Sequence, residues 1–123
     1  MMGLLYEELT GKIMEACFEV SNELGAGFLE SVYEKALLIA LAAKELDAKA
    51  QVPLAVHFRN EPVGQFYADI LVEERVLIEL KAVSRLLPEH QAQVINYLKA
   101  TKLDVGLLIN FGNPRLEYRR LHR

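Results

Sequence analysis

A chain of 123 residues with 52% hydrophobic and 25% charged residues has the size and composition of one globular domain, which we expect to cover residues 1–123. Its net charge of −3 argues against a protein that coats nucleic acid through overall charge, but leaves room for an enzyme with a local basic rim. The single cysteine, Cys17, excludes an internal disulfide framework or a zinc–thiolate site within one chain and predicts a buried, inert thiol.

The start of the chain has no basic region and reaches its first acid at Glu7, which is unlike a secretory signal. No apolar run approaches the roughly 20 residues that a helix needs to span a bilayer. The sequence therefore predicts a cytoplasmic protein without a membrane partner.

Helical periodicity predicts two helices at the start of the chain, over residues 4–24 and 28–44. Gly25, Ala26 and Gly27 separate them, as glycines often do at the end of a helix. The first apolar stripe consists of Leu5, Leu9, Ile13, Ala16, Cys17, Val20 and Leu24. The second consists of Leu29, Val32, Tyr33, Ala36, Leu37, Ala40 and Leu41.

The apolar period then changes to two, which predicts strands near residues 52–58, 63–72 and 76–82 with turns at 59–62 and 73–75. Pro88 suits the start of a helix that runs to about Thr101. Residues 105–111 predict a buried strand, and residues 116–121 a last strand at the edge. The order ααβββαββ predicts an α/β or α+β fold with a mixed sheet.

The strand predicted at residues 76–82 carries charge on an otherwise apolar segment. Because side chains alternate along a strand, Glu79 and Lys81 share a face, while Ile78 and Leu80 point to the opposite one. Burying such groups is costly unless they are paired or bind a metal. The plain alternative is an accessible Glu79–Lys81 ion pair.

Asp69 completes this constellation if residues 73–75 form a three-residue turn, because Asp69 then lies opposite Glu79. Directly opposed side chains have Cβ atoms about 5 Å apart, and two carboxylates there repel unless a cation lies between them. Mg²⁺ or Mn²⁺ would fit, with the Leu80 carbonyl as a further oxygen ligand. Lys81 would then orient or activate the water that attacks a phosphodiester. The alternative is that Asp69 is an ordinary residue at the end of a strand.

Polar residues on two of the predicted helices could join the site. Glu30 could bind the same metal, or simply be an acid at a helix start, where the dipole favours it. Gln93 and Tyr97 lie one turn apart and could contact phosphate, or form a polar patch beside a packed tyrosine.

The residues Gly27, Glu30 and Tyr33 have the spacing that names the GxxExxY proteins, and the chain resembles that family. Further matching segments follow at residues 51–53, 67–69, 78–83, 96–101 and 106–112. The family is placed in the PD-(D/E)XK nuclease superfamily, so the resemblance implies that fold. It implies Asp69 as the motif aspartate, Glu79 and Lys81 as the (D/E)XK element, Glu30 as the early helix acid, and Gln93 and Tyr97 as a QxxxY element.

The chain departs from the family pattern in two places. Ser21 stands where members often have histidine, which leaves any role of that position in doubt. Ala26 interrupts what is often Gly-Pro-Gly, a change with a small conformational effect.

Three functional hypotheses follow. The first is a metal-dependent nuclease acting on DNA or RNA, with Gln93, Tyr97 and Tyr33 at the substrate. Further contacts could come from basic residues that could equally form a solvated edge against aggregation, namely Lys99, Lys102, Arg115, Arg119, Arg120 and Arg123. The second is a catalytically silent nucleic-acid-binding or assembly module, which the acidic pI and the lack of an evident aromatic platform favour. The third is a homodimer, for which exposed Leu86, Leu87 and Leu116 would speak, although a packed loop explains Leu86 and Leu87 equally well.

Overall fold

The computed structural model describes residues 6–123 and confirms the predicted element order ααβββαββ. Its elements are α1 (Glu7–Leu24), α2 (Glu30–Ala43), β1 (Ala48–Phe58), β2 (Glu61–Val72), β3 (Val76–Lys81), α3 (Pro88–Thr101), β4 (Val105–Asn110) and β5 (Glu117–His122). Leu5, expected on the first apolar stripe, lies outside the described residues. Across residues 6–123, no helix combines the length and the apolar composition needed to cross a membrane.

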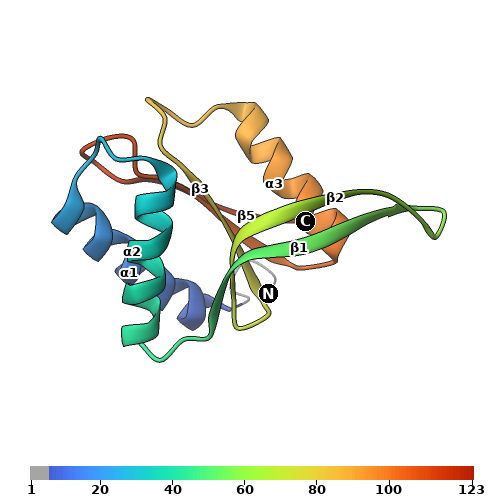
Figure 1. Ribbon diagram of the computed structural model, residues 1–123, viewed down its shortest axis with the longest axis horizontal. Coiled ribbons are helices and arrows are strands. Elements are labelled where there is room, and N and C mark those ends of the chain that lie inside the picture. Colours follow the sequence, from blue (N-terminus) through green and yellow to red (C-terminus); the bar gives the residue numbers. More distant parts are fainter. Residues whose placement is uncertain (1–5) are drawn as a thin grey trace.

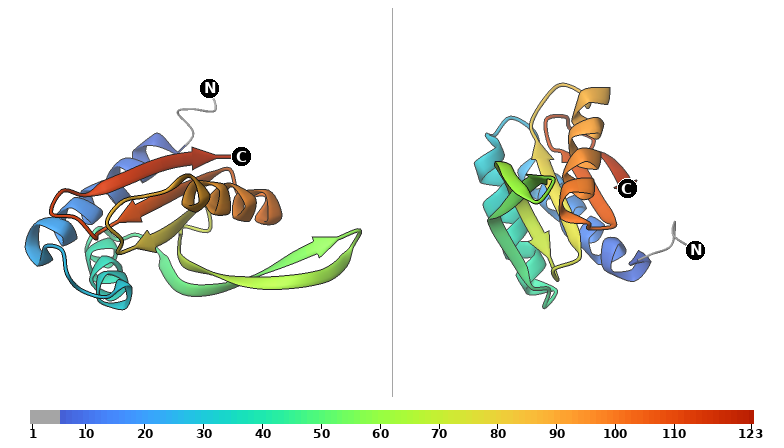
Figure 2. Two further views of the ribbon diagram at one scale, coloured as in Figure 1. Left: turned by 90° about the horizontal axis from the view of Figure 1, so that it is seen from above. Right: turned by 90° about the vertical axis from the view of Figure 1, so that its right-hand side faces the viewer.

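The five strands form one mixed sheet in the order β1-β2-β3-β4-β5. Strands β3 and β4 are parallel and are joined through α3, while the other neighbouring pairs are antiparallel. Figures 1 and 2 show α2 and α3 on opposite sides of the strands. The sheet is therefore sandwiched, with α1 and α2 packed on one face and α3 on the other.

Alternate side chains of β3 belong to two separate apolar cores, as the sequence predicted. Ile78 and Leu80 pack with the buried residues of α1 and α2, whereas Leu77 packs with Val94 and Leu98 of α3. Cys17 lies in the first of these cores, where burial raises the pKa of its thiol to about 12. The thiol therefore stays protonated and inert at neutral pH, as expected.

The hairpin of β1 and β2 extends beyond the body of the molecule as an arm (Figures 1 and 2). At the base of the arm, three side chains pack against the core that includes Val94 and Leu98 of α3, namely Val52, Leu54 and Phe66. Phe58, the last residue of β1, is 60% exposed because the arm continues past the end of α3 (Figure 1).

A network of hydrogen bonds fixes the chain that leaves β3. The buried Asn110 side chain accepts from the Val83 N–H and donates to the Val83 carbonyl, both at 2.9 Å. The Phe111 N–H donates to the Lys81 carbonyl at 2.9 Å. This network holds the end of the strand that carries Glu79 and Lys81.

The apolar residues that would have supported a homodimer are largely covered within the chain. Leu86 and Leu116 are each only 8% exposed, and Leu87 is partly buried. The packed-loop interpretation of Leu86 is therefore confirmed, and these leucines offer no apolar surface for a second subunit.

The close approach of two loops at Gly112 gives a test of this network. A Cβ added at Gly112 would lie 2.0 Å from the Val83 carbonyl oxygen, so Gly112→Ala should destabilise the fold by about 1–3 kcal/mol. A Cβ at Gly11, within α1, meets nothing within 4 Å, so Gly11→Ala should raise stability by about 0.5–1 kcal/mol. Urea unfolding of both variants measures the difference, and equal stabilities would contradict the proposed close packing.

Candidate metal and active site

The candidate site begins where β2 and β3 part. Their backbone pairing follows the predicted register, from Val72 opposite Val76 to Ile70 opposite Ile78. At the next position, side chains replace the ladder. The Asp69 N–H donates to Glu79 Oε1 at 3.2 Å, and the Leu80 N–H donates to Asp69 Oδ2 at 2.7 Å. Each carboxylate is thus held by the backbone of the opposite strand.

Burial and a second negative charge act together on Glu79. Its side chain is only 6% exposed, and this desolvation, followed by the charge of Asp69, raises the pKa of Glu79 to about 8. The hydrogen bond from the Asp69 backbone and the charge of Lys81 oppose this rise without cancelling it. The carboxyl therefore holds a proton at neutral pH unless a cation replaces it.

A cavity of about 180 Å³ opens beside Asp69, between the first turns of α2 and the sheet, and Glu79 and Lys81 are not among the residues that line it. It is lined by Glu30, Ser31, Glu34, Gln51, Asp69 and Leu80. The structure thus brings Glu30 to the same cavity as Asp69 and Leu80. Every charged group in this lining is a carboxylate, so the cavity favours a cation.

Three residues that line this cavity were not predicted as site residues, namely Ser31, Glu34 and Gln51. The amide Nε2 of Gln51 donates to Glu34 Oε1 at 2.7 Å and to Asp69 Oδ1 at 3.4 Å, so it links α2 to β2. Glu34 lies one turn after Glu30 and therefore shares its helix face, which the sequence already indicated. Gln51 could be found only from the strand register, because Ala50 and Val52 pair with the residues on either side of Asp69.

Tyr97 and Gln93 approach the site from α3. The Tyr97 ring stacks on Phe66 of β2, with centroids 3.7 Å apart. Burial raises the pKa of Tyr97, and the charges of Glu79 and Asp69 raise it further, while a hydrogen bond with Gln93 lowers it. Tyr97 is therefore within electrostatic reach of both carboxylates.

Tyr33 has a different place from the one expected. It is fully buried and stacks on Phe111 with centroids 4.7 Å apart. Its hydroxyl donates to the Gly25 carbonyl at 2.6 Å and accepts from the Phe28 N–H at 3.2 Å. Substrate cannot reach this ring, and Tyr33 instead fixes the loop between α1 and α2, so the expected substrate contact is corrected.

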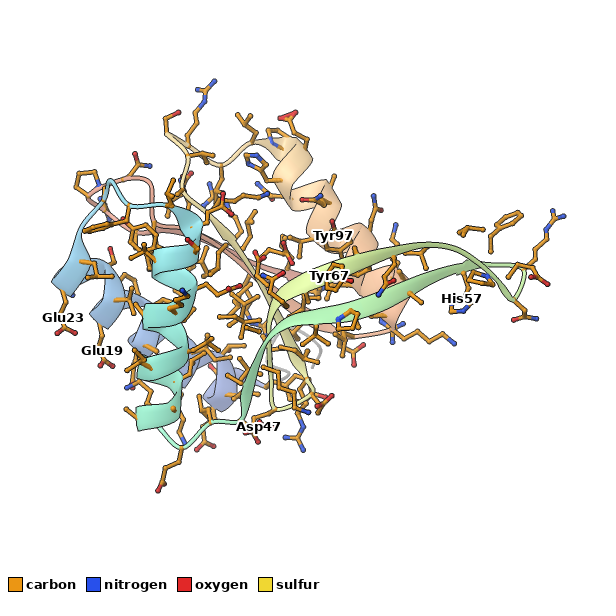
Figure 3. The ribbon with its side chains drawn as sticks, viewed as in Figure 1. Glu19, Glu23, Asp47, His57, Tyr67 and Tyr97 are labelled. Atoms are coloured by element: carbon orange, nitrogen blue, oxygen red, sulfur yellow. The ribbon has the colours of Figure 1, made fainter. Side chains whose placement is uncertain are left out.

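An aromatic ring that the sequence did not single out lies at the rim. Tyr67 is 56% exposed and precedes Asp69 by two residues on β2. It alternates with Phe66 and Ala68, which pack toward α3, so its ring points away from that core. Figure 3 shows Tyr67 near the base of the arm. This ring corrects the expectation that the chain offers no aromatic surface near the site.

The donors at the site suit a hard divalent cation, because all are oxygens. Within residues 6–123, no three His, Cys, Asp or Glu side chains are grouped so that they could hold one ion by themselves. Asp69 and Glu79 would therefore need the Leu80 carbonyl, water or substrate oxygens to complete a coordination shell, as is usual for Mg²⁺. Burial and the charge of Asp69 raise the pKa of Glu79, and a bound cation would counter both effects.

The raised pKa of Glu79 predicts how metal-free stability depends on pH. The folded state holds the proton up to about pH 8, whereas an unfolded glutamate releases it near 4.5, so stability should fall as pH rises between these values. Glu79→Gln should remove this part of the fall and melt above wild type at pH 8, but not at pH 4.5. Melting curves in EDTA test this, with exposed Glu89→Gln as the control, and parallel wild-type and Glu79→Gln curves would contradict it.

Comparisons with known proteins agree with this architecture. A crystal structure of SSO0001 superposes with a TM-score of 0.61 at 16% sequence identity, covering 98% of this chain. The alignment covers 61% of that chain, so this chain spans about three fifths of its length, and the likeness concerns the fold alone. None of the curated proteins compared with the chain matches it. The family model described as the PD-(D/E)XK nuclease superfamily matches residues 7–121, and the chain belongs to that superfamily.

Proposed function

We propose that the protein is a metal-dependent nuclease that hydrolyses phosphodiester bonds of DNA or RNA. The observation that carries this proposal is the pair of carboxylates, Asp69 and Glu79, held by reciprocal backbone hydrogen bonds beside an acidic cavity. Lys81 follows on the same strand, and its charge acts on Glu79. Superfamily membership supports the same chemistry.

In this proposal Asp69, Glu79 and the Leu80 carbonyl hold Mg²⁺ or Mn²⁺, Glu30 holds one of the ion's waters from across the cavity, and Glu34 holds Gln51 in place. When bound, the ion would stabilise the negative charge that develops on the phosphate. Lys81 orients the attacking water and offsets charge on the phosphate. The hydrogen bonds from the Asp69 and Leu80 N–H groups keep both carboxylates oriented throughout.

Substrate contacts come from residues around this centre. Gln93 and Tyr97 lie on the α3 side, where their hydrogen bond would present donors to a phosphate oxygen. The exposed ring of Tyr67 offers a face on which a nucleobase can stack. Within the superfamily we place the chain with the GxxExxY proteins, on the spacing of Gly27, Glu30 and Tyr33.

The competing function is a catalytically silent module that keeps the nuclease fold and binds nucleic acid or a protein. The observation in its favour is that, among the residues described, three acidic or imidazole side chains do not gather around one point. A silent module should show neither metal-dependent cleavage nor a rise in melting temperature with Mg²⁺ or Mn²⁺.

Cleavage of labelled single-stranded and double-stranded DNA and RNA tests the nuclease directly. Wild type should cleave at least one substrate with Mg²⁺ or Mn²⁺ and stop in EDTA. Glu79→Ala and Lys81→Ala should each reduce the rate by about 10²-fold or more, because the first removes a proposed metal ligand and the second removes a positive charge beside the reacting phosphate. Glu89→Ala, on the exposed start of α3, is the matched control and should keep the wild-type rate. Absence of cleavage and of metal-induced stabilisation would overturn the proposal.

The role of the Tyr67 ring can be separated from that of its hydroxyl. Tyr67→Ala should weaken binding of a single-stranded oligonucleotide by about 1–3 kcal/mol, since one base–aromatic stack is lost. Tyr67→Phe keeps the ring and should bind like wild type. Phe58→Ala, which removes another exposed ring of the arm, should have little effect. Fluorescence anisotropy in EDTA measures all four proteins, and equal binding by Tyr67→Ala and wild type would remove Tyr67 from the substrate site.

A further inference from the structure

A second, larger cleft lies apart from the acidic cavity and has the opposite charge. It has a volume of about 810 Å³ and is lined by Arg85, from the loop after β3, and by residues 113–119, from the loop before β5 and the start of that strand. Three of these side chains are arginines, namely Arg85, Arg115 and Arg119. This local concentration of positive charge stands out on a chain whose net charge is −3.

Glu117, the acidic residue that lines the cleft, already accepts hydrogen bonds from within the chain. Glu117 Oε1 accepts the Leu86 N–H at 2.9 Å and Asn110 Nδ2 at 3.1 Å. These hydrogen bonds and the nearby charges of Arg119 and Arg85 hold the pKa of Glu117 below its usual value, so it stays ionised. Its separation of 3.8 Å from Arg119 is a loose, half-exposed ion pair. Three arginines and a single acidic residue thus line the cleft.

The loops that carry these arginines are tied to the candidate active site. Arg85 follows Lys81 by four residues, so their Cα atoms lie no more than about 14 Å apart. Asn110 and Glu117 bind the backbone of Val83 and Leu86, on either side of Arg85. Gly112 permits the two loops to approach this closely. The position of the cleft relative to Glu79 and Lys81 is therefore set by the core of the fold.

We propose that the cleft formed by Arg85, Arg115 and Arg119 binds the phosphodiester backbone of the nucleic acid, a few nucleotides away from the bond at Glu79 and Lys81. Guanidinium groups suit this role because their planar donor pairs match phosphate oxygens. Backbone contacts fix register without reading sequence. The inference rests on the proposed nuclease function, but it concerns binding and not the chemical step.

Binding in EDTA tests the cleft without turnover. Fluorescein-labelled DNA and RNA oligonucleotides of about 20 nucleotides are titrated with wild type, Arg85→Gln, Arg115→Gln and the double variant, at several salt concentrations. Each single substitution should weaken binding about tenfold, the loss expected for one hydrogen bond to a charged group. Each should also lower the slope of log Kd against log salt by about 1. Melting curves confirm that the variants are folded.

The controls are Arg59→Gln, at the turn of the arm, and Arg75→Gln, at the turn between β2 and β3, which lie outside the cleft and should bind like wild type. Equal losses in the controls, or unchanged binding by the double variant, would overturn the inference. Inorganic phosphate is added at the concentration of phosphate groups that the oligonucleotide supplies. If it displaces the oligonucleotide there, the cleft is a free-anion site and the inference is overturned. The binding experiment does not depend on cleavage, so it tests the cleft alone. The cleavage assay with Glu79→Ala and Lys81→Ala tests the nuclease proposal separately.

Discussion

The parting of β2 and β3 at Asp69 and Glu79 is the feature on which the candidate site depends. Backbone pairing between the two strands ends at Ile70 and Ile78. Beyond that pair, Glu79 accepts the Asp69 N–H and Asp69 accepts the Leu80 N–H, each from the opposite strand. The backbone ladder stops at this point, and two hydrogen bonds from the backbone to side chains join the strands and orient both acids.

This arrangement costs free energy in the absence of a cation, because two carboxylates share a largely buried place. The raised pKa of Glu79 is the measure of that cost. Hydrogen bonds hold the residues that follow Glu79 in place. Lys81 is held at its carbonyl by Phe111, and the following loop is held by Asn110. Perturbed pKa values of this kind cluster at functional sites, which supports the proposed role of Asp69 and Glu79.

In the two proposals above, an acidic cavity and an arginine cleft would divide the task of handling a polyanion. The acidic cavity beside Asp69 would attract a cation, and the arginine cleft near Arg85 would attract phosphate. Because the loop after β3 runs from Lys81 to Arg85, one short segment links both. Such a separation lets an acidic chain bind nucleic acid locally while its overall charge keeps nonspecific binding weak.

The sequence by itself determined the elements, their order and the pair of strand faces, because apolar periodicity reports burial directly. It also determined the register that sets Asp69 against Glu79, since a three-residue turn leaves one pairing. Only the tertiary structure decided which residues outside that hairpin complete the site. Gln51 lines the acidic cavity because β1 pairs with β2 in a register that sets it beside Asp69. Tyr33 is not at the cavity, because it is buried and stacked on Phe111. Arg85 and residues 113–119 come from two different loops and line one cleft. These are contacts between segments distant along the chain, and periodicity carries no information about which loops or faces meet.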